Sequence, residues 1–311
     1  MLVPVLNEQE SVALYVQTTR SVLETAEVDF EFLFINDGSS DQTFQRLIEL
    51  ANAEKRIRII NLSRNFGKEI ALTAGIDHAN GDVLIPMDVD LQDPPELIPE
   101  FLEKWREGYD IVYGIRSQRR HDSFMKRTTA AWFYKVFNRL SRIQIPPNAG
   151  DYRLIDRRVA DVIRKMPERN RFMKGLFAWV GFDSIGVLYE RPGRTAGRTK
   201  WSHWRLWNFA LDGLISFSTL PLRVWTYLGA IVAILSFCYG SFIVIRTLAL
   251  GADIPGYASM LTIILFLGGL QLLSIGVLGE YLGRLFIEVK QRPQYIIESM
   301  YPFSSPESEV K

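Results

Sequence analysis

The sequence predicts an α/β fold, a mostly parallel sheet flanked by helices, followed by two hydrophobic helices long enough to cross a membrane. Two observations predict this fold. Short β-type runs alternate with helix-type runs through the first third of the 311 residues, an order that is typical of parallel sheets with helical crossovers. Two long apolar runs without charged residues then follow residue 220.

The alternating runs define the expected elements one by one. Strands are expected at 3–6, 30–35, 57–62, 83–87 and 110–113, and helices at 8–26, 43–53, 68–78 and 95–106. Ligands of such sheets bind beyond the carboxyl ends of the strands. The segments that follow these strands are strongly polar, which predicts that they form a binding site.

The segment after the fourth expected strand carries two carboxylates, Asp88 and Asp90. Residues two apart on an extended strand point to one side. Two carboxylates at a rigid strand end suit Mg²⁺ or Mn²⁺, which proteins hold with one or two carboxylates and the phosphates of a substrate. The alternative is structural, because Asp88 can cap a turn and Asp93 with Pro94 can open the next helix.

The two apolar runs predict a transmembrane hairpin at about 224–248 and 257–280, with core helices as the alternative. No charged residue occurs in 224–245 or 257–279, and Lys and Arg flank the outer ends of the pair, although Arg246 lies near the connector. The positive-inside rule therefore predicts that both ends face the cytosol. Residues 1–10 show no secretory signal pattern, which also favours a cytosolic first domain.

Cationic segments with interleaved aromatic residues precede the apolar runs. Between Arg116 and Arg142 lie many basic residues with one acid, Asp122, and residues 201–217 carry three tryptophans at helical spacing. Both segments are typical of amphipathic helices at a membrane surface. Nucleic-acid binding is the rival interpretation, and the neighbouring apolar runs and the net charge of +1 disfavour it.

Six motifs, in order and spacing, resemble those of the inverting family-two glycosyltransferases of GT-A fold. Within that family the chain is most similar to the polyprenyl-phosphate glycosyltransferases, including bacterial undecaprenyl-phosphate glucosyltransferases and dolichol-phosphate mannose synthase. The motifs are VPVLNE at 3–8, NDGSSD at 36–41, RNFGK at 64–68, DVDLQDPP at 88–95, NAGDYR at 148–153 and GRTKW at 197–201.

The resemblance implies roles for particular residues of the first domain. It implies that the base and ribose of a nucleotide-sugar donor are held by Pro4, Asn7, Glu8 and Asp37. It further implies that Asp88 and Asp90 hold a metal ion and the diphosphate, with Asp90 contributing to catalysis, and that Lys68 and Arg116 lie near the donor phosphates, where exposed surface cations are the alternative.

The acceptor implied by the resemblance is a polyprenyl phosphate. Asp151 stands where the family places its base, and we expect it to orient or activate the acceptor phosphate; the alternative is an aspartate that starts a strand or turn. Five cations between Arg191 and Arg205 have no acid among them, and guanidinium groups match phosphate oxygens well. We expect Arg194, Arg198 and Lys200 to bind that phosphate, a general headgroup-attracting patch being the alternative.

These expectations define an integral membrane enzyme of the bacterial inner membrane that transfers a hexose, with UDP-glucose as the expected donor. GDP-mannose, UDP-N-acetylglucosamine or a modified UDP-sugar are alternatives, and a flippase or scaffold is a non-enzymatic one. A homo-oligomer is possible through the stretch that begins at Arg292. The expected domains are a catalytic domain at 1–200 that includes an amphipathic segment at 123–142, an interfacial helix at 201–221, the hairpin at 222–283 and a cytosolic tail at 284–311.

Overall fold

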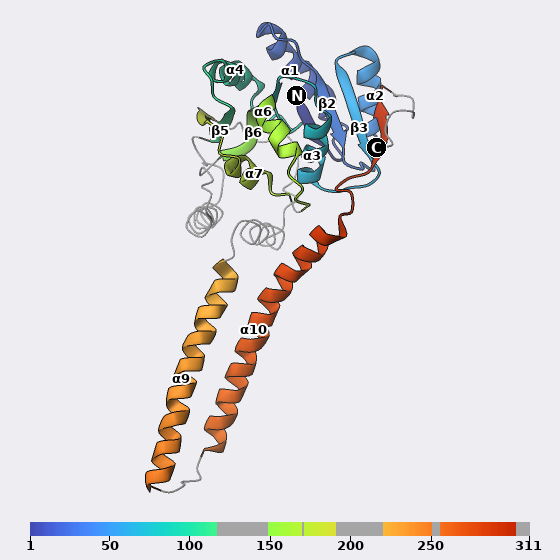
Figure 1. Cartoon of the computed structure of the whole chain (residues 1–311). Helices are drawn as coiled ribbons and strands as arrows, with labels where there is room; N and C mark the ends of the chain where they lie inside the picture. Colours follow the sequence, from blue (N-terminus) through green and yellow to red (C-terminus); the bar gives the residue numbers. More distant parts are fainter. Residues whose placement is uncertain (117–148, 170, 191–219, 251–255, 303–311) are drawn as a thin grey trace.

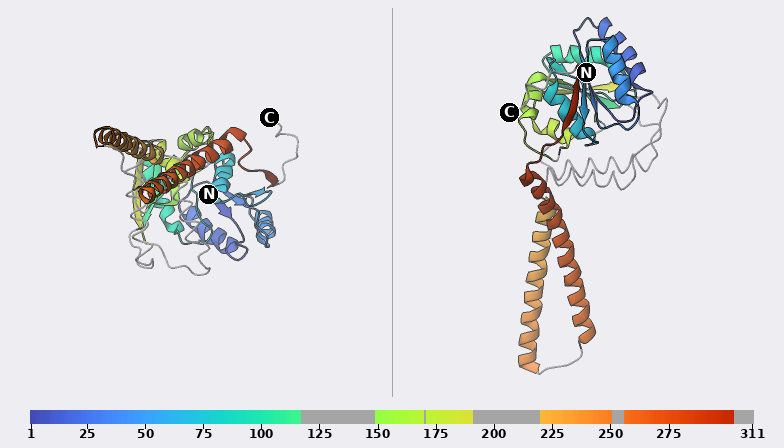
Figure 2. Two further views of the ribbon diagram at one scale, coloured as in Figure 1. Left: turned by 90° about the horizontal axis from the view of Figure 1, so that it is seen from below. Right: turned by 90° about the vertical axis from the view of Figure 1, so that its right-hand side faces the viewer.

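The computed structural model describes residues 1–116, 149–169, 171–190, 220–250 and 256–302. These residues form an α/β domain from which two long helices project as a hairpin (Figures 1 and 2). The α/β fold with a mostly parallel sheet, predicted from the alternating pattern, is confirmed by the strand pairing. The amphipathic segment predicted at 123–142 and the interfacial helix predicted at 201–221 lie almost wholly outside the described residues.

The strands form two hydrogen-bonded groups in the orders β1-β2-β3-β8 and β4-β6-β5-β7. The groups join where Leu2 lies beside residues 85–87, donating its N–H to Ile85 O at 2.9 Å and accepting that of Met87 at 3.0 Å. Within the described sheet, only β6 and β8 are antiparallel to the other strands. The strands are β1 (Leu2–Val5), β2 (Phe32–Asn36), β3 (Ile57–Leu62), β4 (Val83–Leu84), β5 (Ile111–Arg116), β6 (Ala149–Asp156), β7 (Ser184–Tyr189) and β8 (Ile297–Tyr301).

Helices cover both faces of this sheet because side chains along each central strand alternate between two apolar clusters. In β2, Phe32 and Phe34 pack on one face with α1, α2 and α4, whereas Leu33 and Ile35 pack on the other with α3, α6 and α7. The helices are α1 (Val12–Thr25), α2 (Thr43–Ala53), α3 (Lys68–His78), α4 (Ile98–Arg106) with the short η1 (Pro95–Leu97) before it, α6 (Arg157–Arg164) and α7 (Met173–Trp179).

The hairpin consists of α9 (Leu220–Leu250) and α10 (Tyr257–Lys290), which extend away from the sheet (Figure 1). Large apolar side chains on both helices are exposed, among them Phe237 at 77% and Leu272 at 72%. Among the residues that the structure describes, no helix combines the length and the apolar character needed to cross a membrane.

The chain returns from α10 to the sheet, which the sequence did not predict. Strand β8 pairs antiparallel with β3, and the Ser63 N–H donates to Ile296 O at 3.0 Å. Just before it, the Tyr295 hydroxyl donates to Asp77 at 2.9 Å, and the Gln294 amide donates to Glu168 O at 2.6 Å. Residues 292–301, expected to be part of a tail, are therefore an integral edge of the α/β domain.

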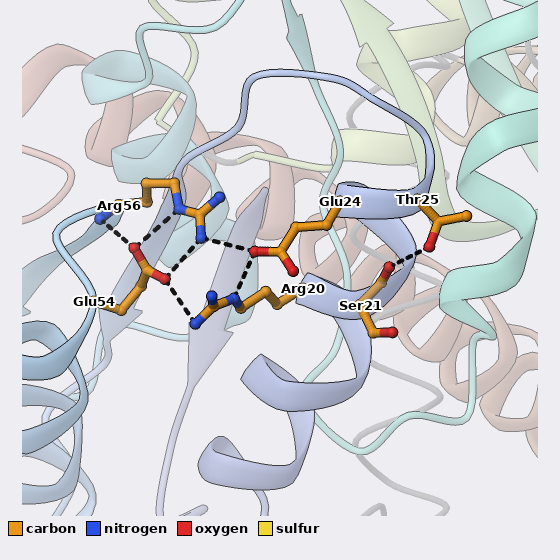
Figure 3. A network of polar contacts seen from close by, with 6 residues as sticks. All are labelled: Arg20, Ser21, Glu24, Thr25, Glu54 and Arg56. Carbon is orange, nitrogen blue, oxygen red and sulfur yellow. Dashed lines mark hydrogen bonds and ion pairs between the residues drawn. The ribbon is translucent and has the colours of Figure 1, made fainter.

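A four-residue ionic network ties α1 to the connection between α2 and β3 (Figure 3). The Glu54 carboxylate lies 2.8 Å from the guanidinium of Arg56 and 3.1 Å from that of Arg20. Glu24 also contacts both arginines, at 3.1 Å and 2.8 Å respectively. Hydrogen bonds from Arg56, together with the charges of the two arginines, lower the pKa of Glu54 from 4.5 to about 2.

We expect Glu54→Gln to lower the free energy of unfolding by about 1 kcal/mol at neutral pH, because networked surface pairs contribute on the order of 0.2–1 kcal/mol each. The pKa of Glu54 is depressed in the folded protein, so its stabilisation is present above the unfolded pKa and is lost as pH falls from 4.5 toward about 2. Thermal unfolding of both proteins across this pH range measures the effect.

Glu49→Gln is the matched control for this prediction. Glu49 pairs only with the neighbouring helical residue Arg46 in the described contacts, and the two side chains are 53% and 57% exposed. Its replacement should change stability by less than about 0.5 kcal/mol. Equal effects of the two substitutions would contradict a special role for the network.

Candidate functional site

The polar segments that follow β1, β2 and β3 lie together at the carboxyl edge of the sheet, as the parallel order requires. Asn7, with a φ of 55°, reaches across to the segment after β2. Its side-chain oxygen accepts the N–H of Ser40 at 2.8 Å, and its own N–H donates to the hydroxyl of Ser39 at 2.9 Å. These contacts fix the first two segments against each other.

Two other residues expected to bind the donor lie beside Asn7. Pro4 is half-buried in β1, opposite Ile35 of β2. The N–H of Glu8 donates to the Thr43 hydroxyl at 2.8 Å, and its carboxylate accepts from the Ser11 hydroxyl at 3.0 Å. Both residues therefore belong to this edge of the sheet, and their donor-binding roles stay predictions.

Asp37 joins the segment after β2 to the segment after β3. It is buried, and its two carboxylate oxygens accept the N–H groups of Phe66 at 2.7 Å and Gly67 at 2.9 Å. Burial raises the pKa of Asp37, although the two N–H groups oppose this. In the structure its carboxylate shapes the loop that leads into Lys68, a structural role that sequence reasoning did not separate from donor binding.

Gly38 permits the close approach of these two segments. Its φ is +65°, and a Cβ added there would lie 2.4 Å from the backbone carbon of Arg64 and 2.5 Å from the nitrogen of Asn65. The backbone itself blocks a side chain, and a shift of a neighbouring rotamer cannot relieve the clash. Only glycine fits this position without moving the loop.

We therefore expect Gly38→Ala to destabilise the domain by roughly 3 kcal/mol or more, combining a strained φ with a backbone clash. Gly67→Ala is the matched control, because Gly67 also has a positive φ of +98° but an added Cβ would meet nothing within 4 Å. With a φ of 98° and a ψ of 156°, Gly67 lies in a region essentially restricted to glycine, so this substitution should cost about 1–3 kcal/mol through backbone strain alone. Thermal unfolding of the two variants checks this order, and a milder effect at Gly38 than at Gly67 would refute it.

The centre of the site is an ionic cluster around Lys68. Its ammonium lies 2.7 Å from one carboxylate oxygen of Asp88, 2.8 Å from the other and 2.9 Å from Asp151. The ammonium of Lys174 lies 3.4 Å from the other oxygen of Asp151. The cluster thus joins residues from the start of α3, from the segment that follows β4, from β6 and from α7. Sequence reasoning named three of these four residues.

The charges of the cluster reinforce one another. Burial alone would lower the pKa of Lys68, but the carboxylates of Asp151 and Asp88 outweigh burial and raise it. Burial alone would raise the pKa of Asp151, but Lys68 and Lys174 hold it well below its ordinary value of 3.8. Both partners therefore stay ionised at neutral pH.

Asp90 has a different partner from Asp88. Its carboxylate accepts the N–H of Gln92 at 3.1 Å in a turn where Leu91 has a φ of 52°. Both aspartates are half-exposed. The turn-forming role considered for Asp88 thus falls to Asp90 in the structure, and both carboxylates still follow β4 at the edge of the sheet.

Arg116 ends β5 and lies near Asp151. Its guanidinium donates to the Tyr189 hydroxyl at 3.3 Å and lies 3.9 Å from the carboxylate of Asp93. It also lies beside the backbone of Gly150, where an added Cβ would be 3.5 Å from the guanidinium. The Tyr189 hydroxyl donates to Asp93 at 2.5 Å. Burial, the charge of Asp93 and its hydrogen bond raise the pKa of Tyr189 to about 12. Arg116 is thus anchored within the site and is not a free surface cation.

Sequence reasoning missed Lys174 and Glu69. Glu69 accepts the N–H of Met173 at 2.9 Å, which holds the start of α7 beside α3, and burial with the charge of Asp151 raises the pKa of Glu69 to about 7. One signal could have found Lys174, since it is the single charged residue in the apolar run 172–179. A lysine in such a run needs a nearby carboxylate.

The residues expected to bind the acceptor phosphate, Arg194, Arg198 and Lys200, lie outside the described residues, so their roles stay predictions. What the structure does place is a set of carboxylates and cations at the carboxyl edge of a mostly parallel sheet. That edge is where α/β enzymes bind nucleotides. The fold and the site together define an α/β protein with charged side chains gathered at the edge where such folds bind their ligands.

Comparison with known proteins identifies the family. The profile of glycosyl transferase family 2 matches residues 1–164, and that of the GtrB C-terminal hairpin matches residues 220–285. The chain belongs to glycosyl transferase family 2 and is a glycosyltransferase. The family predicted from the six motifs is confirmed, and the flippase or scaffold alternative is excluded.

Similar proteins extend over nearly the whole chain. An uncharacterized glycosyltransferase of Synechocystis is 54% identical, over 97% of this chain and 95% of its own. The SfII prophage-derived bactoprenol glucosyl transferase of Shigella flexneri is 51% identical, over 97% of both chains. The prophage bactoprenol glucosyl transferase homolog of Escherichia coli K12 is 50% identical, over 96% of this chain and 97% of its own.

Solved structures resemble the α/β domain more distantly. Glucosyl-3-phosphoglycerate synthase from Mycobacterium tuberculosis, in complex with Mn²⁺, UDP and phosphoglyceric acid, superposes with a TM-score of 0.45 at 19% identity, over 68% of this chain and 74% of its own. A similarity at this level does not transfer the details of a site.

Proposed function

We propose that this enzyme transfers glucose from UDP-glucose to a polyprenyl phosphate, with inversion at the sugar carbon, at the cytosolic face of a membrane. The observation that carries the proposal is the 51% identity to a bactoprenol glucosyl transferase over 97% of both chains. At that identity and coverage, the catalytic domain and the hairpin are both matched. The cluster of Lys68, Asp88 and Asp151 supplies the charges that such a reaction requires.

Asp88 and Asp90 are the proposed ligands of a divalent ion. Among the described residues no group of three or more His, Cys, Asp and Glu side chains could hold a metal. Two carboxylates at a strand end nevertheless suit Mg²⁺ or Mn²⁺, which complete their shell with substrate phosphates and water. When bound, such an ion offsets the charge that develops on the departing diphosphate. Asp88 and Asp90 would hold it.

The chain's own residues then position the two substrates. The edge of the sheet that carries Pro4, Asn7, Glu8 and Asp37 is proposed to bind the base and ribose of the donor. Lys68 and Arg116 are cations close to Asp151 and are proposed to contact the donor phosphates. Positive charge there stabilises the diphosphate as the bond between the sugar carbon and its oxygen breaks.

Asp151 is proposed to orient the acceptor phosphate. A phosphate monoester is already anionic near neutral pH, so its oxygen can attack the sugar carbon without a strong base. The low pKa of Asp151, set by Lys68 and Lys174 against the effect of burial, favours orientation over proton removal. Arg194, Arg198 and Lys200 are proposed to bind the same phosphate, on the strength of their sequence spacing alone.

We further propose that α9 and α10 lie within the bilayer. Their charge-free runs and exposed apolar side chains support this, as does the match to the GtrB C-terminal hairpin. Because α10 leads within seven residues to β8 of the sheet, from Lys290 to Ile297, the ends of the hairpin belong on the side of the α/β domain. The proposed organisation is thus a cytosolic catalytic domain, an interfacial segment at 201–221 and a membrane hairpin.

A panel of nucleotide sugars tests the donor and the acceptor together. Purified enzyme in bilayers that contain polyprenyl phosphate is incubated with UDP-glucose, GDP-mannose or UDP-N-acetylglucosamine, and the lipid product is measured. We expect product from UDP-glucose at a rate at least about tenfold above the others, a difference of about 1.4 kcal/mol in activation free energy. Preference for another donor would correct the sugar, and no lipid product from any donor would refute the proposal.

A further inference from the structure

The ammonium of Lys68 pairs with Asp88, the carboxylate that the proposed function assigns to a metal ion. Its ammonium contacts both oxygens of Asp88, at 2.7 Å and 2.8 Å, while also contacting Asp151 at 2.9 Å. The side chains of all three residues are 35–36% exposed, so solvent and ions reach the cluster. In this state one lysine ammonium forms ion pairs with both carboxylates.

A divalent ion and this ammonium compete for the same oxygens. A metal ion binds carboxylate oxygens at about 2.0–2.1 Å, and an ammonium on the same carboxylate would then lie within a few ångströms of a double positive charge. Repulsion between the two cations is large at such a distance, even with the screening of a half-exposed site. Asp88 therefore cannot serve both cations in their best positions.

The attachment of Lys68 allows it to move without disturbing the fold. It is the first residue of α3, behind a loop that Asp37 holds through the N–H groups of Phe66 and Gly67. A lysine head is a compact charge on a flexible four-carbon stem, so its ammonium can change partners while its backbone stays in place. A diphosphate bound beside Asp88 would offer that ammonium an anionic partner.

We propose that Lys68 is an internal counter-cation, which neutralises Asp88 before the donor binds and transfers to the donor diphosphate when metal and nucleotide bind together. The inference rests on the proposed function, because it takes Asp88 as the metal ligand. Its consequence is that the free enzyme binds the metal weakly and the nucleotide brings the metal in. Departure of UDP then returns Lys68 to Asp88, which favours release of the metal with the product.

Mn²⁺ binding in the absence of nucleotide tests this directly. The decrease of the electron paramagnetic resonance signal of free Mn²⁺ reports binding to the full-length protein in detergent. We expect Lys68→Met to bind Mn²⁺ alone about tenfold more tightly than the wild type, and Lys68→Arg, which keeps the charge, to stay within about twofold. Unchanged or weaker binding by Lys68→Met would overturn the proposal.

Lys174→Met is the matched control. Lys174 contacts Asp151 at 3.4 Å and approaches the cluster from α7. Its removal also subtracts one positive charge but leaves Lys68 on Asp88, so Mn²⁺ binding should tighten by less than about threefold. Equal tightening in both lysine variants would show a general charge effect and would overturn the specific role of Lys68.

UDP binding supplies a second test, in which Lys68→Met should weaken binding instead of tightening it. With saturating Mn²⁺, Lys68→Met should bind UDP about tenfold more weakly, because the diphosphate loses its ammonium partner. A purely structural role of Lys68 would weaken both Mn²⁺ and UDP binding, and that outcome would refute the exchange. Neither experiment contains the hexose of the donor or the lipid acceptor, so failure here is distinguishable from failure of the proposed glucosyl transfer.

Discussion

Asp88→Asn is expected to reduce kcat/KM for glucosyl transfer by at least about 10³-fold. Asparagine keeps the shape of the side chain but removes the charge that would hold a divalent ion, and such an ion contributes several kcal/mol to stabilising a departing diphosphate. The substitution also removes an ionic partner of Lys68. Initial rates with labelled UDP-glucose measure the loss.

Asp88→Glu is the control for charge, since it restores a carboxylate one methylene further out. It should recover part of the activity and most of the Mn²⁺ binding measured in the presence of UDP. Wild-type turnover by Asp88→Asn, with unchanged dependence on metal, would show that Asp88 is no metal ligand.

Asp151→Asn is expected to lower kcat by about 10²–10⁴-fold while leaving UDP affinity within a few-fold of the wild type. The expected size is that of a lost acid–base or orienting group, because Asp151 is proposed to act on the acceptor and not on the donor. Steady-state kinetics with a polyprenyl phosphate, combined with UDP titration, separates the two effects. Wild-type values of both turnover and donor affinity would reject the assignment.

The same strand offers a matched control, Asp156→Asn. Asp156 also lies on β6, but its carboxylate accepts from the Trp105 indole at 2.7 Å and from the N–H of Arg158 at the start of α6. Its loss should reduce stability, because a helix cap contributes about 1 kcal/mol, without changing turnover per folded molecule. Equal losses of turnover in the two variants would show that Asp151 acts through the fold.

The parallel strands and the helices that connect them were predictable because each leaves a local pattern in the sequence. The helices α2 and α3 begin and end where the alternation of apolar and polar runs predicts, at Thr43–Ala53 and Lys68–His78. Strand β3 likewise matches its predicted range, Ile57–Leu62. Each of these elements buries one or two continuous faces, and a buried face leaves a clear periodicity in the sequence.

Strand β8 was not predictable for two physical reasons. It lies at the edge of the sheet with only partly buried side chains, so its alternation is weak. Its partner is also remote in the sequence. The amide of Asn61 on β3 donates to Glu298 on β8 at 2.8 Å, across 237 residues. No local pattern specifies such a pairing.

The site was predictable in its residues more than in its contacts. Asp88, Lys68 and Asp151 were all named, and in the structure both aspartates lie within 2.9 Å of the lysine ammonium. The lysine bridge itself was not predicted, because Asp88 lies 20 positions and Asp151 lies 83 positions after Lys68 in the sequence. Asp37 shows the converse, since a conspicuous polar motif proved to hold the loop through backbone N–H groups.

The central claim is that a metal-dependent site at the sheet edge glucosylates a lipid phosphate. Its most direct test is transfer of label from UDP-glucose to polyprenyl phosphate in bilayers that contain the purified enzyme, with and without EDTA. We expect a labelled lipid that disappears with EDTA, returns when Mg²⁺ or Mn²⁺ is added back, and is absent with Asp88→Asn. No labelled lipid from the wild-type enzyme, or the same yield with EDTA, would contradict the account.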